Sequence, residues 1–192
     1  MNQIIKNTII LFVITLVAGI CLGTVHDITL DPIAQAQEAA ATKTYQEVYP
    51  DAASFDEPQE LADAVTAAAD SISEWGFGKV TINDAKEALD ASGNQIGYLI
   101  TSTSAESYGG NVQIAVGITN EGELTGIGFL SISDTPGLGM RAKEPDFKDQ
   151  FIGKKAENLE VTKTGASADN QIEAISGATI TSKAVTNATD AA

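Results

Sequence analysis

The chain has 192 residues, enough for one sizeable domain beside a membrane segment. Its net charge of −15 argues against a nucleic-acid or anionic-membrane partner. The only cysteine, Cys21, and the only histidine, His26, exclude an internal disulfide and a Cys/His zinc cluster, and they leave little for nucleophilic catalysis. Redox chemistry would therefore need a borrowed cofactor.

An uncharged run from Thr8 to Val25 is rich in Ile, Leu and Val, and with its flanks it is long enough to span a bilayer. Lys6 precedes the run and Asp27 follows it. The positive-inside rule therefore predicts a cytoplasmic N-terminus (1–7), one transmembrane helix (8–25) in the cell membrane, and an extracytoplasmic remainder. A cleaved signal peptide is the alternative, since Ala34-Gln35-Ala36 fits the A-x-A pattern, but this site lies well beyond the apolar run.

The segment after the membrane run is predicted to be helical. Residues 31–49 predict one helix, with Pro32 near its start and Pro50 beyond its end. Residues 61–72 predict a second, Ala-rich helix. Between them, residues 51–60 are acidic and turn-like; a solvated face explains them better than a calcium site.

The domain organisation follows from these elements. Residues 26–75 are expected to form a helical connecting region, and residues 76–192 the main domain. The aromatic residues of Trp75-Gly76-Phe77, at this boundary, are expected to pack in the core.

The middle of the chain is β-like. Apolar residues alternate strictly over 112–118, which predicts a strand with one buried face. Residues 120–122 form a turn signal before a second apolar run, 124–132, so the two runs predict an antiparallel hairpin. The remaining candidates are strands at 79–82, 97–103 and 159–164, and a short helix over 144–152. We predict an α+β class with a mainly antiparallel sheet and flanking helices.

Two glycines flank an apolar residue in Asp134-Thr135-Pro136-Gly137-Leu138-Gly139. Pro136-Gly137 favours a turn with positive φ at the glycine. A planar apolar ligand resting on Leu138 would explain the pattern, and so would a buried turn. In Tyr108-Gly109-Gly110, before the clearest strand, the backbone can also approach another group closely.

Near the C-terminus, Ser176-Gly177-Ala178-Thr179 resembles a turn that leads into a helix, with Ser176 as a candidate cap. A helix N-terminus suits a phosphate, and Thr179 and Thr181 supply hydroxyls there. On the local pattern alone an ordinary capped helix is the preferred interpretation, and the pattern does not choose between the two threonines.

These two motifs resemble a known family. Asp134–Gly139 looks like the E/D-TPGLG loop of the FMN-binding domain, and Ser176–Thr179 resembles its S/T-GAT flavinylation site. With the N-terminal span, nearly the whole chain resembles the G subunit of the Rnf electron-transport complex. The C subunit of the sodium-pumping NADH:quinone reductase is similar but usually longer.

The resemblance implies a covalent cofactor. It implies FMN joined by a phosphoester to Thr179, attached by a flavin transferase. The residues that match the motifs around it, and so would contact the cofactor, are Ser176, Gly177, Ala178, Thr135, Gly137, Leu138 and Gly139. No residue is expected to be catalytic or to bind a metal. The chain departs from the family at Glu173, where Asp is usual, and at Ile132, where relatives often have His.

The resemblance also implies a role and partners. It implies a membrane-anchored electron carrier, one subunit of a translocase that acts as a ferredoxin:NAD oxidoreductase and moves sodium ions or protons. The expected partners are the other subunits of that complex, the flavin transferase and the membrane, with no nucleic acid. Two alternatives stay open: a membrane-anchored interaction domain without redox function, and a flavin reductase of an extracellular acceptor.

Overall fold

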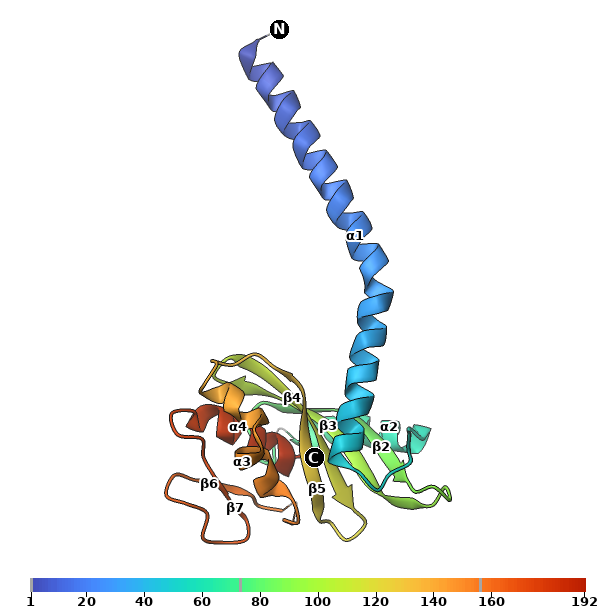
Figure 1. Cartoon of the computed structure of the whole chain (residues 1–192), viewed down its shortest axis with the longest axis vertical. Coiled ribbons are helices and arrows are strands. Elements are labelled where there is room, and N and C mark those ends of the chain that lie inside the picture. Colours follow the sequence, from blue (N-terminus) through green and yellow to red (C-terminus); the bar gives the residue numbers. More distant parts are fainter. Residues whose placement is uncertain (1, 73, 156) are drawn as a thin grey trace. The chain divides into compact units, whose positions relative to one another are not determined.

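A computed structural model of the chain describes residues 2–72, 74–155 and 157–192. The chain divides into two compact units, residues 1–41 and 42–192. The first unit is the N-terminal part of helix α1 (Gln3–Val48), which is coloured blue in Figure 1. This helix is long and apolar enough to cross a membrane, in agreement with the predicted span.

Helix α1 corrects one prediction, because residues 31–49 do not form a separate helix. Pro32 lies inside α1, which ends at Val48, shortly before Pro50. A proline removes one backbone hydrogen bond and crowds the preceding turn. No glycine lies close to Pro32 in sequence, and the residues after it are strong helix formers. The helix therefore continues through the proline.

The second unit is built on a five-stranded antiparallel sheet in the order β1-β2-β3-β4-β5. The sheet runs through the middle of the domain in Figure 1. Its strands are β1 (Ser54–Asp56), β2 (Val80–Leu89), β3 (Gln95–Ser107), β4 (Gly110–Thr119) and β5 (Leu124–Ile132). The predicted hairpin is present as β4 and β5, with Val116 opposite Ile127. The α+β class is thereby confirmed.

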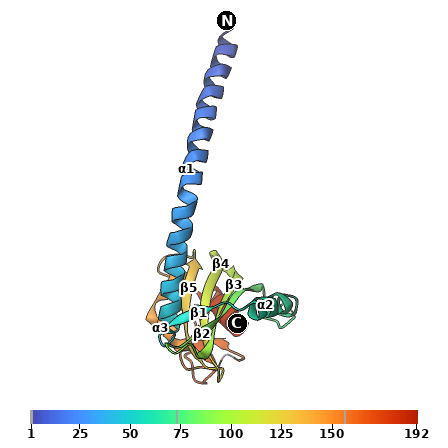
Figure 2. The ribbon, with the colours of Figure 1, turned by 90° about the vertical axis from the view of Figure 1, so that its right-hand side faces the viewer.

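The other elements flank this sheet. They are α2 (Gln59–Ile72), η1 (Gly139–Lys143), α3 (Pro145–Lys148), η2 (Asp149–Phe151), β6 (Glu160–Thr162), β7 (Gln171–Glu173) and α4 (Thr179–Asp190). β6 and β7 pair in parallel as a small second sheet. Figure 2 shows α2 toward one side of the domain, away from β5.

The main core lies between the sheet and α4. Val112, Ile114 and Val116 on β4 are fully buried in it. Helix α4 is held to β3 by a hydrogen bond in which Ser102 Oγ donates to the carbonyl oxygen of Ala188 at 2.7 Å. Ala184, Val185 and Ala188 on α4 are almost fully buried, so apolar burial and this bond together hold the helix against the sheet.

The opposite face of β4 is covered as well. Ala115 is fully buried there and packs with Leu99 and with Val48 from the last turn of α1. The prediction of a single buried face is therefore wrong for this strand. The alternation shows only which side chains are strongly apolar. Alanine is small and occurs on both buried and exposed faces, so Ala115 did not indicate a second buried face.

Three further expectations differ from the structure. The helix expected over 144–152 is a single turn, α3, followed by the 3-10 turn η2, although Phe147 and Phe151 do pack edge to face at 5.6 Å between ring centroids. Trp75 is 54% exposed, so its expected core position is wrong, whereas Phe77 packs against the core. Within the acidic stretch, Ser54–Asp56 forms the edge strand β1.

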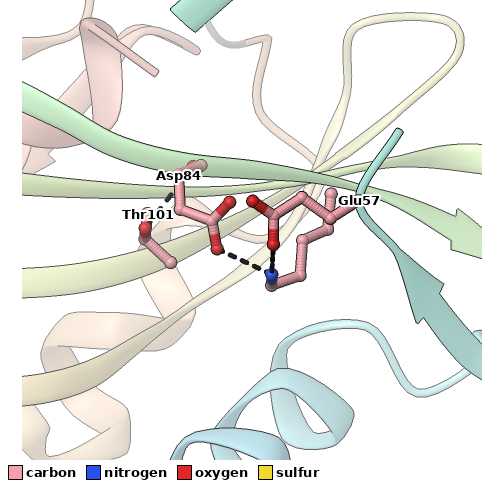
Figure 3. Close-up of polar contacts among 4 residues, drawn as sticks. Glu57, Asp84 and Thr101 are labelled. Atoms are coloured by element: carbon pink, nitrogen blue, oxygen red, sulfur yellow. Dashed lines mark hydrogen bonds and ion pairs between the residues drawn. The ribbon is translucent and has the colours of Figure 1, made fainter. Parts of the chain in front are cut away.

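An ion-pair cluster secures that edge strand (Figure 3). Lys86 Nζ lies 2.6 Å from a carboxylate oxygen of Glu57 and 2.8 Å from one of Asp84. Burial would lower the pKa of Lys86, but the hydrogen bonds and charges of the two carboxylates outweigh it and raise the pKa. Strand β1 is thus connected to β2 by its backbone pairing and by the ion pair of Glu57, the residue that follows it.

Candidate functional site

Helix α4 begins differently from the predicted capped start. The helix starts at Thr179, with Ala178 in the N-cap position and no side-chain capping bond. Gly177 has a φ of 79°, and the amide of Ala178 donates to the carbonyl of Ile175 at 2.9 Å. This tight turn places Ser176 outside the helix, so the prediction of Ser176 as a cap is wrong. Because the first amides of a helix have no intrahelical acceptor, the start of α4 retains donors for an anion.

The loop 134–139 forms the opposite wall of the site. The amide of Leu138 donates to the carbonyl of Thr135 at 3.1 Å, and Gly137 takes the positive φ, 77°, that was predicted. The turn leaves the Leu138 side chain 42% exposed. A Cβ on Gly177 would lie 3.1 Å from a methyl carbon of Leu138, so the two motifs are in contact.

Asp134 joins the two motifs by hydrogen bonds that the sequence did not reveal. Its Oδ2 accepts from Thr181 Oγ1 at 2.6 Å and from Ser107 Oγ at 2.9 Å, and its Oδ1 accepts from the amide of Thr135 at 2.6 Å. Three segments that are far apart in sequence therefore meet at one carboxylate. An acidic residue at the start of a glycine-rich loop was the only available signal.

The electrostatics of Asp134 agree with this geometry. Burial would raise the pKa of Asp134, but hydrogen bonds from Thr181, Thr135, Ser107 and the backbone of Gly109 outweigh it and hold the pKa below its ordinary value. The carboxylate is therefore ionised at neutral pH.

A pocket of about 510 Å³ lies between the loop and the start of α4. Six of the eight residues predicted to contact a cofactor line it: Thr135, Leu138, Gly139, Gly177, Ala178 and Thr179. Its other lining residues are Tyr108, Asp134 and Ile180, which were missing from the predicted contacts. The volume is in the range of small-molecule sites.

Ser176 and Gly137 do not line this pocket. Gly137 forms the exposed turn of the loop, with no atom within 4 Å of its Cβ position. Ser176 lines a separate pocket of about 300 Å³, together with Glu173 and Arg141. The backbone amide of Glu173 donates a hydrogen bond to Gln150 Oε1 at 2.7 Å, which fixes the position of this residue.

The structure also separates the two threonines. Thr179, the first residue of α4, lines the pocket and is half-buried. Thr181 is 0% exposed, and its hydroxyl is committed to Asp134. Of the two threonines, Thr179 is the one that lines the pocket.

Comparison with known proteins agrees with this organisation. Residues 107–192 match the family model of the FMN-binding domain, and residues 1–48 match that of the RnfG N-terminal region. The G subunit of the Na⁺-translocating ferredoxin:NAD⁺ oxidoreductase complex of Acetobacterium woodii is 36% identical over 192 residues, covering 96% of this chain and 87% of that protein. The proton-translocating counterpart of Clostridium ljungdahlii is 30% identical over 187 residues, with 96% and 87% covered.

Among solved structures, NqrC of Shewanella oneidensis aligns with a TM-score of 0.49 and 18% identity, over 74% of this chain and 66% of that chain. The matches to family models define an FMN-binding domain that follows an RnfG-type N-terminal helix. The chain belongs to the family of G subunits of ion-translocating Rnf oxidoreductase complexes.

Proposed function

We propose that this chain is a membrane-anchored electron carrier of an Rnf-type ferredoxin:NAD oxidoreductase, and that it holds FMN linked through its phosphate to Thr179. The observation that carries the proposal is the pocket between the loop 134–139 and α4, with Thr179 on its lining. The family membership supports the cofactor class, and the exposure of Thr179 supports the attachment point.

The local chemistry suits a phosphoester at this position. A phosphate on Thr179 would lie at the first turn of α4, where backbone amides and the helix dipole favour negative charge. Attachment requires a flavin nucleotide whose phosphate carries a leaving group. The Thr179 oxygen–phosphorus bond forms as the bond to that group breaks, and the flavin transferase takes the hydroxyl proton.

The rest of the pocket suits a flat, largely apolar ring. Leu138, Ile180 and Tyr108 supply apolar surface around the glycines of the two motifs. When bound, the flavin supplies one- and two-electron transfer, while the protein supplies its position and electrostatic surroundings. Tyr108 and Ile180 are exposed, so the pocket opens at the surface, where the cofactor of another subunit can approach.

The proposed arrangement in the membrane places the N-terminus in the cytoplasm and the flavin domain outside. The charge asymmetry of Lys6 and Asp27 around the apolar run supports it. The run is uncharged, so we assign the ion pathway to other subunits. Relatives named for sodium and for proton translocation both resemble this chain, and the proposal includes either ion.

The test is the intact mass of the full-length protein produced together with its flavin transferase. Wild type is expected to carry the mass of one FMN and a flavin spectrum that survives denaturation. Thr179→Ala removes the acceptor oxygen and is expected to abolish both, whereas Thr179→Ser keeps an acceptor and serves as the matched control. Covalent flavin retained in Thr179→Ala would overturn the attachment point.

The same sample separates the two alternative functions. A colourless protein with the mass of the polypeptide alone would favour the interaction domain. Turnover of an electron acceptor by the purified protein without membrane partners would favour the reductase.

A further inference from the structure

We propose that Asp134 is a positioning residue of the flavin site: its carboxylate holds the loop 134–139 against the first turn of α4 through Thr181, and this bond sets the width of the pocket. The inference rests on the proposed function, and it assigns a role to two residues outside the set predicted to bind the cofactor.

The first argument is the direction of the Thr181 hydroxyl. Two other buried threonines of α4, Thr186 and Thr189, donate their hydroxyls to the carbonyl four residues earlier, each at 2.9 Å, as helix threonines commonly do. Thr181 instead donates to Asp134, 47 residues away in sequence, at 2.6 Å. A bond to an ionised acceptor is about twice as strong as a neutral one. This threonine therefore stabilises a tertiary contact.

The second argument is that the same carboxylate accepts hydrogen bonds from two further segments of the site. Its Oδ2 also accepts from Ser107 at the end of β3, and its Oδ1 fixes the amide of Thr135 at the start of the loop. No lysine, arginine or histidine forms an ion pair with Asp134 among the residues that the structure describes. Its hydrogen-bond donors are neutral groups of three separate segments, so its bonds fix the positions of these segments relative to one another.

The third argument is steric. A Cβ on Gly139 would overlap the carboxyl group of Asp134, and a Cβ on Gly109 would overlap the carbonyl oxygen of Ser133. Both glycines let the neighbouring backbone approach the Asp134 region closely. The loop packs against the carboxyl group of Asp134 at Gly139, and the turn between β3 and β4 packs against the Asp134 backbone at Gly109.

The consequence concerns the pocket. Leu138 lies between Thr135 and Gly139, which are both adjacent to the carboxylate, and it touches Gly177 at the start of α4. Loss of the Thr181 bond releases the loop from the helix, so the apolar wall formed by Leu138 moves away from Thr179. A flavin attached there would keep its covalent bond and gain freedom of its ring.

The test compares variants of the full-length protein produced with and without the flavin transferase. Thr181→Val removes the donor and keeps the shape, Thr181→Ser restores a hydroxyl, and Thr186→Val is the matched control that removes only an intrahelical bond. In the flavin-free protein, the amides of residues 135 and 137–140 are expected to exchange ~10-fold faster in Thr181→Val, since a bond to a charged group is lost.

In the flavin-loaded protein, Thr181→Val is expected to keep the mass of one FMN but to lose fluorescence anisotropy and visible circular dichroism of the ring. Thr181→Ser is expected to restore both signals, and Thr186→Val to leave them at the wild-type level. Wild-type ring signals and loop exchange in Thr181→Val would overturn the positioning role alone. Absence of FMN mass from the wild type would overturn the proposed function and this inference together.

Asp134→Asn gives a second route if Thr181→Val does not fold. This variant weakens the same contact and removes a negative charge from the pocket lining. Because reduction adds negative charge to the flavin, the midpoint potential of the flavin is expected to rise. An unchanged potential together with unchanged loop exchange would overturn the proposal.

Discussion

At the scale of single residues, the site distinguishes two threonines that the local sequence treats alike. Thr179 and Thr181 both follow the Gly177 turn and both carry a hydroxyl near the start of α4. A helix turns about 100° per residue, so residues two apart project from different sides. Thr181 is directed into the interior and bonded to Asp134, while Thr179 lines the pocket. The rotation of the helix therefore separates Thr179, the proposed attachment point, from the buried Thr181.

The lowered pKa of Asp134 predicts how this contact responds to acid. For a carboxyl group with a folded-state pKa below its unfolded value of about 3.9, the stabilisation is present above that value and is lost as pH falls through the folded-state pKa. Asp134→Asn is expected to be less stable than wild type at neutral pH by about 1–2 kcal/mol, since a half-buried charged acceptor is replaced.

The measurement is urea unfolding of both proteins at a series of pH values from about 7 down to about 3. The difference in free energy of unfolding should shrink as pH falls, because only the wild type loses the stabilising ionised form. A difference that is constant with pH would contradict the assignment of an ionised Asp134.

At the scale of elements, the last turns of α1 fit against glycines on the sheet. Thr125 Oγ1 donates to the carbonyl of Val48 at 2.7 Å, and a Cβ on Gly117 would lie 2.9 Å from a methyl carbon of Val48. A Cβ on Gly128 would overlap a methyl group of Thr44. Small residues on β4 and β5 thus allow the helix end to approach the strand backbone closely.

Two glycines of strand β5 provide a matched test of this packing. Gly128→Ala is expected to destabilise the domain by about 1–3 kcal/mol, because the added methyl overlaps Thr44 and crowds Val48. Gly126→Ala is the control: its Cβ would lie 3.6 Å from the Val48 carbonyl oxygen, an ordinary contact, so it should be neutral or slightly stabilising. Equal thermal midpoints for the two variants would contradict this packing.

At the scale of the whole molecule, the boundary between the two units falls inside α1. The second unit begins at Thr42 and so includes the turn that packs on the sheet, with the buried residues Val48 and Tyr49. Tyr49 also donates its hydroxyl to the carbonyl of Ile96 at 2.8 Å. The end of the helix is therefore part of the domain core, while its apolar N-terminal part is long enough to cross a membrane.

This boundary predicts which fragments fold. A fragment of residues 42–192 is expected to remain in the soluble fraction and to unfold cooperatively, since it keeps the complete second unit. A fragment of residues 51–192 loses Val48 and Tyr49 and should be less stable by at least the burial of one large apolar side chain, about 1.5–3 kcal/mol. Circular dichroism during heating compares them, and equal stability would show that the helix end contributes nothing.

Much of this protein follows from local patterns in the sequence. The apolar run of α1, the alternation in β4 and the glycine turns at Gly137 and Gly177 each depend on neighbouring residues, so the span, the hairpin and both turns were predictable. The ordered pair of motifs indicated the family. Local patterns also misled, at Pro32, where one helix continues, and at Ser176, where the Gly177 turn places the serine outside the helix.

The tertiary structure alone decided which distant residues meet. The bonds from Ser107 and Thr181 to Asp134 join segments 27 and 47 residues from that carboxylate. The burial of Ala115 depends on Val48, in another element. The pocket forms where the loop 134–139 and the start of α4 come together, with a methyl carbon of Leu138 3.1 Å from the position of a Cβ on Gly177. Contacts of this kind arise from the packing of whole elements, and no periodicity or motif along one segment encodes them.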